Sequence, residues 1–309
     1  MQFFVGVTDN DWFNFLAAKG PDELNFWRPS GKGFKAIEAG APFLFKLHSP
    51  LNFIAGGGFF VRAENLPLSL AWDAFGEKNG ASAFQQFRNL VVRHRDKTEG
   101  DVEICCIILN EPFFLPRDQW IPIPEDWSKN IVTGKCYGTD DPLGRRLWAE
   151  VQTRLVAMRG DTAAEEFGQM LASTDSHYGK EYLQRGRLGQ GAFRVLVTSA
   201  YQRRCAVTGE KTLPVLQAAH IQSFAEDGPN CISNGLLLRS DLHILFDRGY
   251  MTVTPDYTVE ISRRLKEDYS NGRDYYLFHG RKLATLPHDG NEQPGIEYLR
   301  WHNERVYLS

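Results

Sequence analysis

The sequence has few cysteines, no long apolar run and no excess of basic residues. Its five cysteines form no C-x-x-C pair, and Cys105 and Cys106 are adjacent. This pattern indicates neither a disulfide framework nor a structural zinc site, so we expect a protein of the reducing cytoplasm without structural zinc. No apolar stretch approaches the roughly 18 residues of a membrane helix, and the first residues lack the pattern of a signal peptide.

The charge balance argues against one class of nucleic-acid-binding protein. Lys and Arg number 35 and Asp and Glu number 38, which gives a formal net charge of -3. A uniformly basic coat is therefore excluded, although a local basic face is not. The chain has 42% hydrophobic and 24% charged residues, as globular proteins do, and its 309 residues predict two domains.

The first half of the chain, residues 1–150, is rich in aromatic residues, glycine and proline. The stretch 69–95 has helical spacing with a break near Gly80, whereas 111–127 holds too much proline for a helix. Several strands with short helices between them predict a small, mostly β, barrel-like domain. Apolar runs predict these strands at 3–8, 41–47, 52–63 and 101–110.

Helical spacing begins near residue 141, and we expect a helical linker over 151–182 and a second domain over 183–309. The stretch 180–205 holds six basic residues and one acidic residue. Such a stretch is either a solvated surface or a set of phosphate contacts. The residues of this stretch that we expect on a DNA backbone are Arg185, Arg187, Arg203 and Arg204.

Polar residues follow a particular order in the stretch 217–250, QAAHIQSFAEDGPNCISNGLLLRSDLHILFDRGY. An apolar strand ends at His220, a turn signal follows at Asn234, and LRSDLHILFD has helical spacing. His243 and Asp247 are four residues apart on this helix and share a face, where an imidazole and a carboxylate can bind one divalent cation. His220 is placed to face the same point.

These residue types suit the hydrolysis of a phosphodiester. A neutral histidine near pH 7 can take a proton from water, and a cation can stabilise the charge on the phosphate and the leaving oxygen. An asparagine can fix the loop or orient the base through its amide. Structural explanations exist as well, because a buried histidine is commonly a core residue and Asp247 can cap a helix or pair with Arg239 or Arg248.

Taken together, CAVTGE, AAHI and NGLLLRSDLHILFDRG, with the strand hairpin after them, resemble the HNH (ββα-metal) nuclease superfamily. The version is the one found at the C-terminus of many bacterial restriction enzymes, and the resemblance covers roughly 200–298. It implies that His220 is the general base, Asn234 the middle asparagine and His243 the last histidine and a metal ligand. Asp247 is then a second ligand. The implied cofactor is Mg²⁺, with Mn²⁺, Co²⁺ or Ni²⁺ as alternatives.

Two positions depart from the superfamily pattern. The residue before the expected base is Ala219, where relatives often carry an acidic or histidine ligand. The cation would then rely on water, the substrate phosphate or another side chain. Cys205 is followed by AVTGE, not by the second cysteine of a C-x-x-C knuckle as in many relatives, so again no structural zinc is expected.

The first 150 residues resemble the EVE branch of the PUA superfamily. The resemblance rests on LNFWRPSGKGFKAIEAGAPFLFKLHSPLNFIAGGGFFVRAENLPLSLAWDAFG and on IILNEPFFLPRDQWIPIPEDWSKNIVTGKCY. It implies a β-barrel that reads modified or flipped bases. Flipping suits this task because a pocket can enclose an extruded base, whereas a methyl group inside the duplex offers little discrimination.

The expected base pocket combines planar and polar side chains. Trp27 lies in the loop-like FWRPSGKG, and the glycines at 56–58 predict a bulge or a close backbone approach. Arg28 and Lys32 suit the phosphates around an extruded base, and a solvated loop explains them equally. The aromatic candidates are also expected in the core of a small β domain. The four pocket candidates are Trp27, His48, Asn52 and Trp72.

The combined expectation is an α+β protein: a PUA-like β-barrel domain with short helices, a helical linker and a ββα-metal (HNH) nuclease domain. It implies a modification-dependent, type IV restriction endonuclease without a membrane partner. The enzyme would flip 5-methylcytosine or 5-hydroxymethylcytosine in double-stranded DNA and cut with one divalent metal, as a homodimer at least on DNA. Three alternatives stay open: a front domain that reads sequence or structure, a non-catalytic binder with a decayed nuclease site, and an RNA-directed enzyme.

Overall fold

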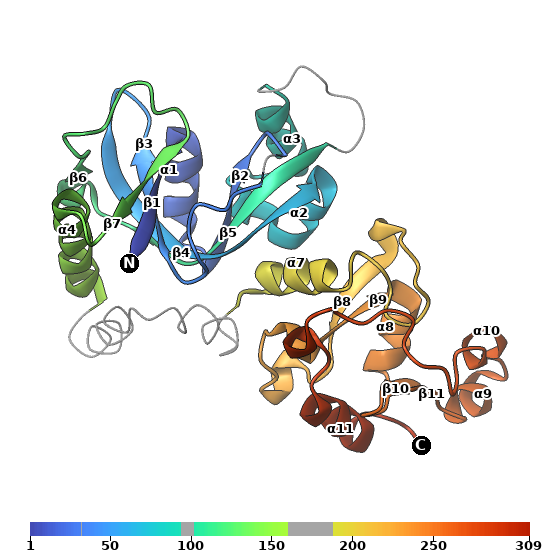
Figure 1. Cartoon of the computed structure of the whole chain (residues 1–309). Helices are drawn as coiled ribbons and strands as arrows, with labels where there is room; N and C mark the ends of the chain where they lie inside the picture. Colours follow the sequence, from blue (N-terminus) through green and yellow to red (C-terminus); the bar gives the residue numbers. More distant parts are fainter. Residues whose placement is uncertain (32, 94–101, 160–187) are drawn as a thin grey trace. The chain divides into compact units, whose positions relative to one another are not determined.

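The chain divides into two compact units, Met1–Gln184 and Arg185–Ser309. Among the residues that the structure describes, which are given at the end of this paragraph, no helix is long and apolar enough to cross a membrane. Most of the expected linker over 151–182 falls outside these ranges, and the expected domain boundaries remain predictions. The computed structural model describes residues 1–31, 33–93, 102–159 and 188–309 (Figure 1).

The first unit is built on one seven-stranded sheet. The spatial order is β2-β5-β4-β3-β1-β7, with β6 paired to β4 beside this path. β1 and β3 run parallel, and the other pairs are antiparallel. Within the described residues the sheet does not close on itself, so the mixed α+β class is confirmed and the PUA-like barrel is not. The strands are β1 (Gln2–Thr8), β2 (Glu23–Arg28), β3 (Pro42–Leu47), β4 (Phe53–Pro67), β5 (Glu103–Phe114), β6 (Ile121–Pro122) and β7 (Gly134–Gly138).

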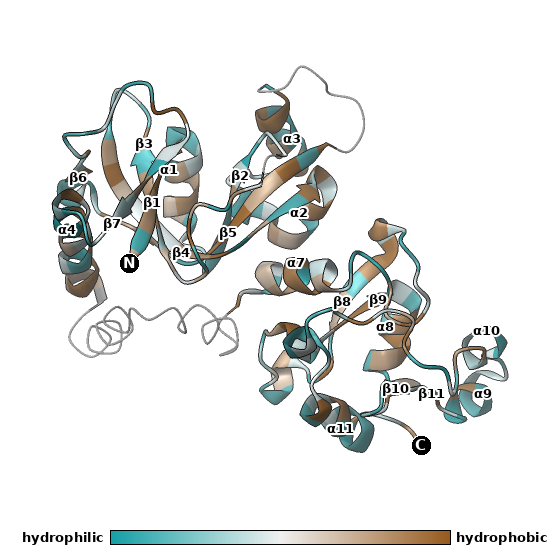
Figure 2. Ribbon diagram, in the orientation of Figure 1, coloured by the Kyte–Doolittle hydropathy of each residue, from teal (hydrophilic) through white to brown (hydrophobic). Residues whose placement is uncertain are grey.

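Two apolar clusters pack on this sheet, and side chains alternate between them along β1, as a strand buried on both faces requires. Phe4 belongs to the cluster with Trp12 of α1, whereas Phe3 and Val5 belong to the other cluster, with Trp148 of α4. Figure 2 shows the apolar character of β5, the strand beside β4 in the sheet. The helices of the unit are α1 (Asn10–Lys19), α2 (Leu68–Phe75), α3 (Phe84–Val92) and α4 (Pro142–Arg159).

Helix α1 has clear local start and stop signals, although the sequence analysis did not predict it. The side chain of Asp9 accepts a hydrogen bond from the backbone N–H of Trp12 at 2.9 Å, which satisfies one of the free donors of the first turn. Gly20 ends the helix in the left-handed region at φ 58°. Strands β2 and β7 were also missed. Trp27, expected in a loop, lies in β2 opposite Cys106 of β5.

The glycines of β4 let this strand lie close to its neighbours. A β-carbon at Gly56 would lie 2.3 Å from the carbonyl oxygen of Phe113, and one at Gly57 would lie 2.7 Å from that of Phe43. The register of β4 against β5 shifts in the same region. The bulge and the close approach predicted for these glycines are therefore present, and the approaching backbone is that of β5 and β3.

The second unit contains the expected strand, helix and hairpin, and one strand that was not predicted. β8 and β9 pair antiparallel, with His220 opposite Gly235, and β10 pairs with β11. The sequence predicts only a turn after Asn234, but β9 starts directly there. The elements are α7 (Gln190–Ala200), β8 (Leu216–His220), β9 (Gly235–Arg239), α8 (Ser240–Asp247), β10 (Met251–Val253), β11 (Val259–Ile261), α9 (Arg264–Tyr269), α10 (Arg273–Tyr276) and α11 (Ile296–Arg305).

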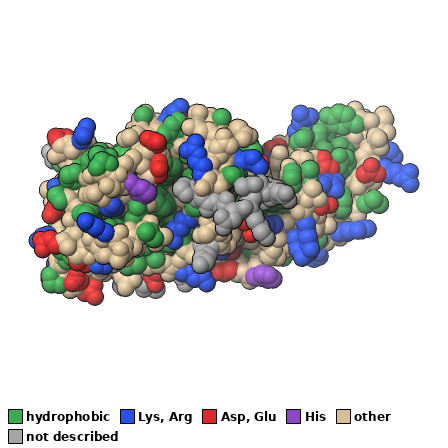
Figure 3. Space-filling model, turned by 90° about the horizontal axis from the view of Figure 1, so that it is seen from above, with side chains coloured by type: hydrophobic (Ala, Val, Ile, Leu, Met, Phe, Trp, Pro, Cys, Tyr) green, Lys and Arg blue, Asp and Glu red, His purple; other side chains and the backbone are tan. Residues whose placement is uncertain are grey.

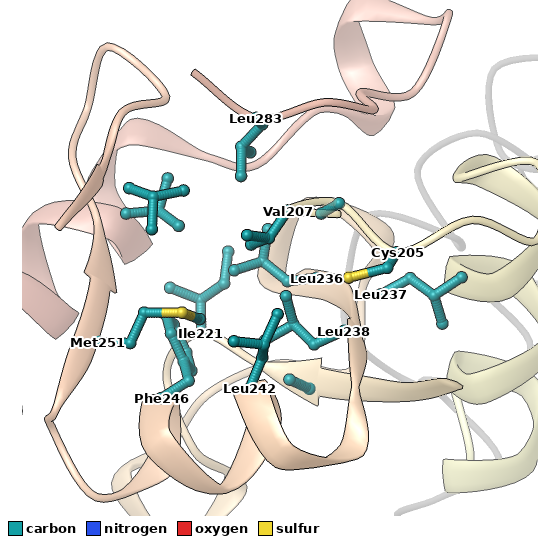
Figure 4. Close-up of a cluster of buried hydrophobic side chains, with 14 of the residues drawn as sticks. Cys205, Val207, Ile221, Leu236, Leu237, Leu238, Leu242, Phe246, Met251 and Leu283 are labelled. Carbon is teal, nitrogen blue, oxygen red and sulfur yellow. The ribbon is translucent and has the colours of Figure 1, made fainter. Parts of the chain in front are cut away.

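One apolar core fixes α8 against the β8–β9 hairpin (Figure 4). Leu236 and Leu238 of β9 are fully buried, as are Leu242 and Phe246 of α8 and Met251 of β10. Burying a side chain of this kind stabilises the fold by about 1.5–3 kcal/mol. The polar residues of α8 are thus held in place by the apolar residues that alternate with them along the helix. On the surface, Lys and Arg are interspersed with acidic residues in the view of Figure 3.

Candidate functional site

His220 ends strand β8 and is held on two sides. Its ring stacks on the ring of Phe193 from α7, with centroids 3.8 Å apart and 11° between the planes. Its Nε2 atom lies 2.8 Å from Oδ1 of Asn230. Burial lowers the pKa of His220 from its usual 6.5 and His243 adds to this, while the bond to Asn230 and the charge of Asp247 oppose it. A ring that stays neutral near pH 7 can accept a proton from water.

His243 and Asp247 lie one turn apart on α8. Nε2 of His243 is 3.3 Å from Oδ2 of Asp247. Nδ1 of His243 is 2.8 Å from Oε1 of Gln217 on β8. Because an amide oxygen only accepts hydrogen bonds, this contact places a ring proton on Nδ1. In the neutral ring the lone pair is then on Nε2, and it faces the carboxylate.

The donor set of His243 and Asp247 fits a divalent cation. A lone pair and a carboxylate oxygen 3.3 Å apart repel each other unless a proton or a metal ion lies between them. A metal ion at about 2.1 Å from each atom fits this separation. Gln217 makes the outer bond that metal-binding histidines commonly have. In the described part of the chain no group of three or more His, Cys, Asp or Glu is arranged for a metal.

Asn234 is fully buried and closes the loop between β8 and β9. Its Oδ1 accepts from the backbone N–H of Gln222 at 2.8 Å, and its Nδ2 donates to the carbonyl oxygens of Gln222 and Pro229, each at 2.9 Å. These bonds join the two ends of the loop that follows His220. Asn234 therefore shapes the loop, and the amide that touches the His220 ring belongs to Asn230.

One cavity of about 610 Å³ brings His220, His243 and Asp247 together. Arg305 is its only lining residue with a permanent positive charge among the described residues, and Phe224 at the same cavity is 66% exposed. A volume of this size is typical of ligand sites. The other lining residues are Ala218, Ile221, Ser223, Phe224, Glu226, Trp301, His302, Arg305 and Val306.

His302 attaches α11 to the end of α8. Its Nε2–H donates to the carbonyl oxygen of Phe246 at 3.1 Å, so its Nδ1 accepts from the hydroxyl of Thr252 at 2.8 Å. The ring also stacks on Phe246 with centroids 3.7 Å apart. Burial lowers the pKa of His302 to about 4, so the ring stays neutral at neutral pH. These contacts hold Arg305 of α11 near the turn of α8 that carries Asp247.

One structural explanation for Asp247 and the two departures from the superfamily pattern can be compared with these contacts. The guanidinium of Arg239 makes two hydrogen bonds to Asp241, at 2.6 and 2.7 Å, so its carboxylate partner is Asp241 and not Asp247. Ala219 is fully buried in the core and does not line the cavity. Cys205 is a free, buried thiol.

Residues 205–254 match the model of the HNH endonuclease family. This HNH segment contains His220, Asn230, His243 and Asp247, and it ends before α11. No curated protein matches the chain.

Two solved structures show a distant likeness. A mutant form of the ZmASCH protein from Zymomonas mobilis shares 12% identity at a TM-score of 0.33, over 48% of this chain and 95% of that chain. A modification-dependent TagI restriction endonuclease shares 15% identity at a TM-score of 0.26, over 92% of this chain and 75% of that chain.

Outside the HNH segment, in the first unit, Trp27 and Trp72 meet at Phe87 of α3. The ring centroids of Trp27 and Phe87 are 5.5 Å apart, and those of Trp72 and Phe87 are 6.1 Å apart. Both tryptophans are half-buried. Nε1 of Trp27 donates to the carbonyl oxygen of Asn79 at 2.9 Å. The two expected pocket tryptophans therefore form one partly exposed aromatic group.

His48 and Asn52 lie in the turn between β3 and β4. His48 is exposed, and its backbone N–H donates to Oδ1 of Asn10 at 2.9 Å. Asn52 has a φ of 50°, and its Oδ1 accepts from Nζ of Lys46 at 2.7 Å. The four expected pocket residues thus fall into two pairs, and the base pocket remains a prediction.

The residues expected to contact the DNA backbone differ in how far their side chains are exposed to solvent. The guanidinium of Arg28 lies 5.0 Å from the ring centroid of Phe34 and 5.7 Å from that of Phe4, and burial lowers its pKa. Arg203 is half-buried at a φ of 57°, whereas Arg204 is exposed. Lys32, Arg185 and Arg187 lie outside the described residues.

Several residues of the site were missed by the sequence analysis. Gln217 and Asn230 lie within the stretch 217–250. Neither amide stands at a sequence spacing from the histidines that would identify it as part of the site. Trp301 and Arg305 are remote in sequence from His220, and only the folding of α11 onto α8 brings them to the cavity. A residue pattern read along the chain gives no signal for such a contact.

Proposed function

We propose that the protein is a DNA endonuclease that cuts DNA containing 5-methylcytosine or 5-hydroxymethylcytosine. The observation that carries the nuclease activity is the shared cavity of His220, His243 and Asp247, within a segment that matches the HNH endonuclease family. The modified base is proposed from the resemblance of the first 150 residues to EVE domains. The partly exposed group of Trp27 and Trp72 supports it.

Four residues of the cavity and Asn234 beside it have proposed roles in hydrolysis. His220 takes a proton from the water that attacks phosphorus. His243 and Asp247 hold a divalent cation, which when bound offsets the charge on the scissile phosphate and the leaving oxygen. Arg305 binds a non-bridging oxygen of the same phosphate. Asn234 keeps the loop after His220 in its shape.

In the first unit, an extruded base stacks on the tryptophan group. Stacking on an aromatic ring is worth about 1–3 kcal/mol per base. The Nε1–H of Trp27 already donates to the carbonyl oxygen of Asn79, so Trp27 would contact the base through the face of its ring. We further propose that His48 and Asn52 contact the nucleotide beside the flipped base, and that Arg28, Lys32, Arg185, Arg187, Arg203 and Arg204 contact phosphates.

Two further features belong to this proposal. A homodimer on DNA would bring one cavity to each strand, which cutting both strands requires. We also propose a cytoplasmic location, where reducing conditions would keep the five free cysteines as thiols.

The test is digestion of otherwise identical DNAs that carry cytosine, 5-methylcytosine, 5-hydroxymethylcytosine or its glucosylated form, with Mg²⁺, Mn²⁺, Co²⁺ or Ni²⁺. Cutting of methylated or hydroxymethylated DNA in preference to plain DNA is expected. Equal cutting of all DNAs would support the nuclease activity and contradict the specificity for a modified base. Binding without cutting under every ion would indicate a non-catalytic binder, and preferred cutting of a competing RNA would indicate an RNA-directed enzyme.

A further inference from the structure

The side chain of Asn230 bridges the His220 ring and the backbone at the start of the second unit. Asn230 is 5% exposed. Its Nδ2 donates to the carbonyl oxygen of Leu188 at 2.6 Å, and its Oδ1 lies 2.8 Å from Nε2 of His220. A carbonyl oxygen only accepts, so the amide nitrogen has to face Leu188 and the amide oxygen has to face the ring. A second donor, Nε2 of Gln190, lies 3.4 Å from the same oxygen.

We propose that Asn230 is the positioning residue of the catalytic base, which keeps a proton on Nε2 of His220 and leaves Nδ1 as the atom that accepts a proton from water. A neutral imidazole carries one ring proton, and the amide oxygen of Asn230 can only be bonded by a protonated nitrogen. The catalytic meaning of this contact rests on the proposed nuclease function, whereas the position of the proton does not.

Phe193 fixes the plane of the His220 ring, and the bond to Asn230 selects one of the two orientations within that plane. The two rings are stacked at 3.8 Å and nearly parallel, so the imidazole plane is fixed. A rotation of 180° about the Cβ–Cγ bond would keep the ring stacked on Phe193. It would, however, place a ring C–H group against Asn230, and the hydrogen bond would be lost. Leu188 and Phe193 both precede the HNH segment, so the orientation of the base depends on residues outside the family match.

The position of the ring proton determines the path of each proton during hydrolysis. The oxygen of the attacking water bonds to phosphorus while one proton of that water moves to Nδ1. The bond from phosphorus to the leaving sugar oxygen breaks, and that oxygen takes a proton from solvent. The imidazolium keeps its Nε2–H bonded to Asn230, whose amide oxygen stabilises the positive charge.

Two side-chain amides thus assign opposite tautomers to His220 and His243, two of the three histidines that line the cavity. Asn230 holds the proton of His220 on Nε2, whereas Gln217 holds the proton of His243 on Nδ1. Each histidine then presents the nitrogen that its task needs: Nδ1 of His220 for a proton, and Nε2 of His243 for a cation beside Asp247.

The test is nuclear magnetic resonance of the full chain, with ¹⁵N-labelled histidine and without DNA, at a pH above the pKa of His220. Long-range ¹H–¹⁵N correlation distinguishes protonated from unprotonated ring nitrogens, and the signals of His220 are assigned by their loss in His220→Gln. The expected result is a proton on Nε2. A proton on Nδ1 overturns the proposal, whether or not the protein cuts DNA. A proton on Nε2 in a protein that cuts no DNA would contradict only the proposed nuclease function.

Variants of Asn230 give the second readout. Asn230→Ala is expected to yield a mixture of His220 tautomers and to lower kcat roughly 10- to 100-fold, by analogy with the loss of a hydrogen-bonded partner of a metal-binding histidine. Asn230→Asp still accepts from Nε2–H, so it should keep the tautomer and move the acid limb of the pH–rate profile to higher pH, because a carboxylate favours the imidazolium.

The matched control for lost stability is Asn303→Ala, because Asn303 also makes three side-chain hydrogen bonds in the same unit but none to His220. It is expected to lower the melting temperature and to keep the His220 tautomer. A single wild-type tautomer in Asn230→Ala would overturn the proposal. So would an unchanged pH–rate profile in Asn230→Asp.

Discussion

Nε2 of His243 and Oδ2 of Asp247 are 3.3 Å apart across one turn of α8, while Nδ1 of the same histidine is bonded to Gln217. This relationship joins two elements, because Gln217 lies on β8 and the other two residues lie on α8. The strand thus sets the protonation of a ring that the helix carries. We propose that this pair binds one divalent cation.

Loss of either Asp247 or Gln217 should weaken metal binding. Asp247→Ala removes a ligand, and Gln217→Ala removes the bond that keeps the lone pair of His243 on Nε2. For each variant we expect Mn²⁺ to bind roughly 10- to 100-fold more weakly, as measured by isothermal titration calorimetry on the full chain. Asp274→Ala, an exposed aspartate of α10, is the control. A wild-type isotherm for Asp247→Ala would remove this residue from the site.

Arg305→Ala should weaken both DNA binding and cleavage, because it removes the one permanent positive charge that lines the cavity among the described residues. The slope of log Kd against log salt is expected to fall by about 0.9, the value for one phosphate contact. Arg300→Ala is the matched control, since Arg300 is exposed on the same helix and does not line the cavity. Equal slopes for the two variants would mean that Arg305 binds no phosphate.

His302 should make the second unit sensitive to acid. The pKa of its buried ring is lowered from 6.5 to about 4, so the folded state resists a proton that the unfolded state binds. Its contribution is therefore fully present above about pH 6.5 and is lost as the pH falls toward about 4, by about 3 kcal/mol in total.

The measurement is urea unfolding of wild type and His302→Gln at several pH values. The variant has no titrating ring, so it should be less stable than wild type at neutral pH, and the difference should shrink as the pH falls. A difference that stays constant over this range would show that His302 does not titrate as its burial requires.

Trp72→Ala should reduce the preference for modified DNA. Loss of one stacking partner, worth about 1–3 kcal/mol, corresponds to a fall of roughly fivefold or more in the ratio of cleavage rates on methylated and plain DNA. His48→Ala, in the other pair of expected pocket residues, is the comparison. Should His48→Ala lower the ratio while Trp72→Ala keeps it, the pocket lies in the turn between β3 and β4.

Much of the second unit could be predicted from the sequence because its signals are local. The strand ending at His220, the helix with His243 and Asp247 four residues apart, and the hairpin after it are all present. The short strand β9 was missed because five residues, most of them apolar, next to a turn signal give no periodicity that separates strand from loop.

The first unit was harder to predict, since its sheet is assembled from strands that are distant in sequence. β2 pairs with β5, and β1 pairs with β3 and β7, and no residue pattern fixes such partners. The same limit applies to the site. Asn230 reaches Leu188, and α11 reaches α8, through tertiary packing alone, so the histidines were predictable and their partners were not.

Nicking of supercoiled DNA that contains 5-methylcytosine, by wild type and His220→Ala side by side with a divalent cation, tests the central claim most directly. Wild type should nick this DNA, and His220→Ala should bind it with similar affinity but lose cleavage by several orders of magnitude, because the variant lacks the imidazole that we propose takes the proton from water. Cleavage by His220→Ala at the wild-type rate would contradict the assignment of His220 as the base and, with it, the proposed active site.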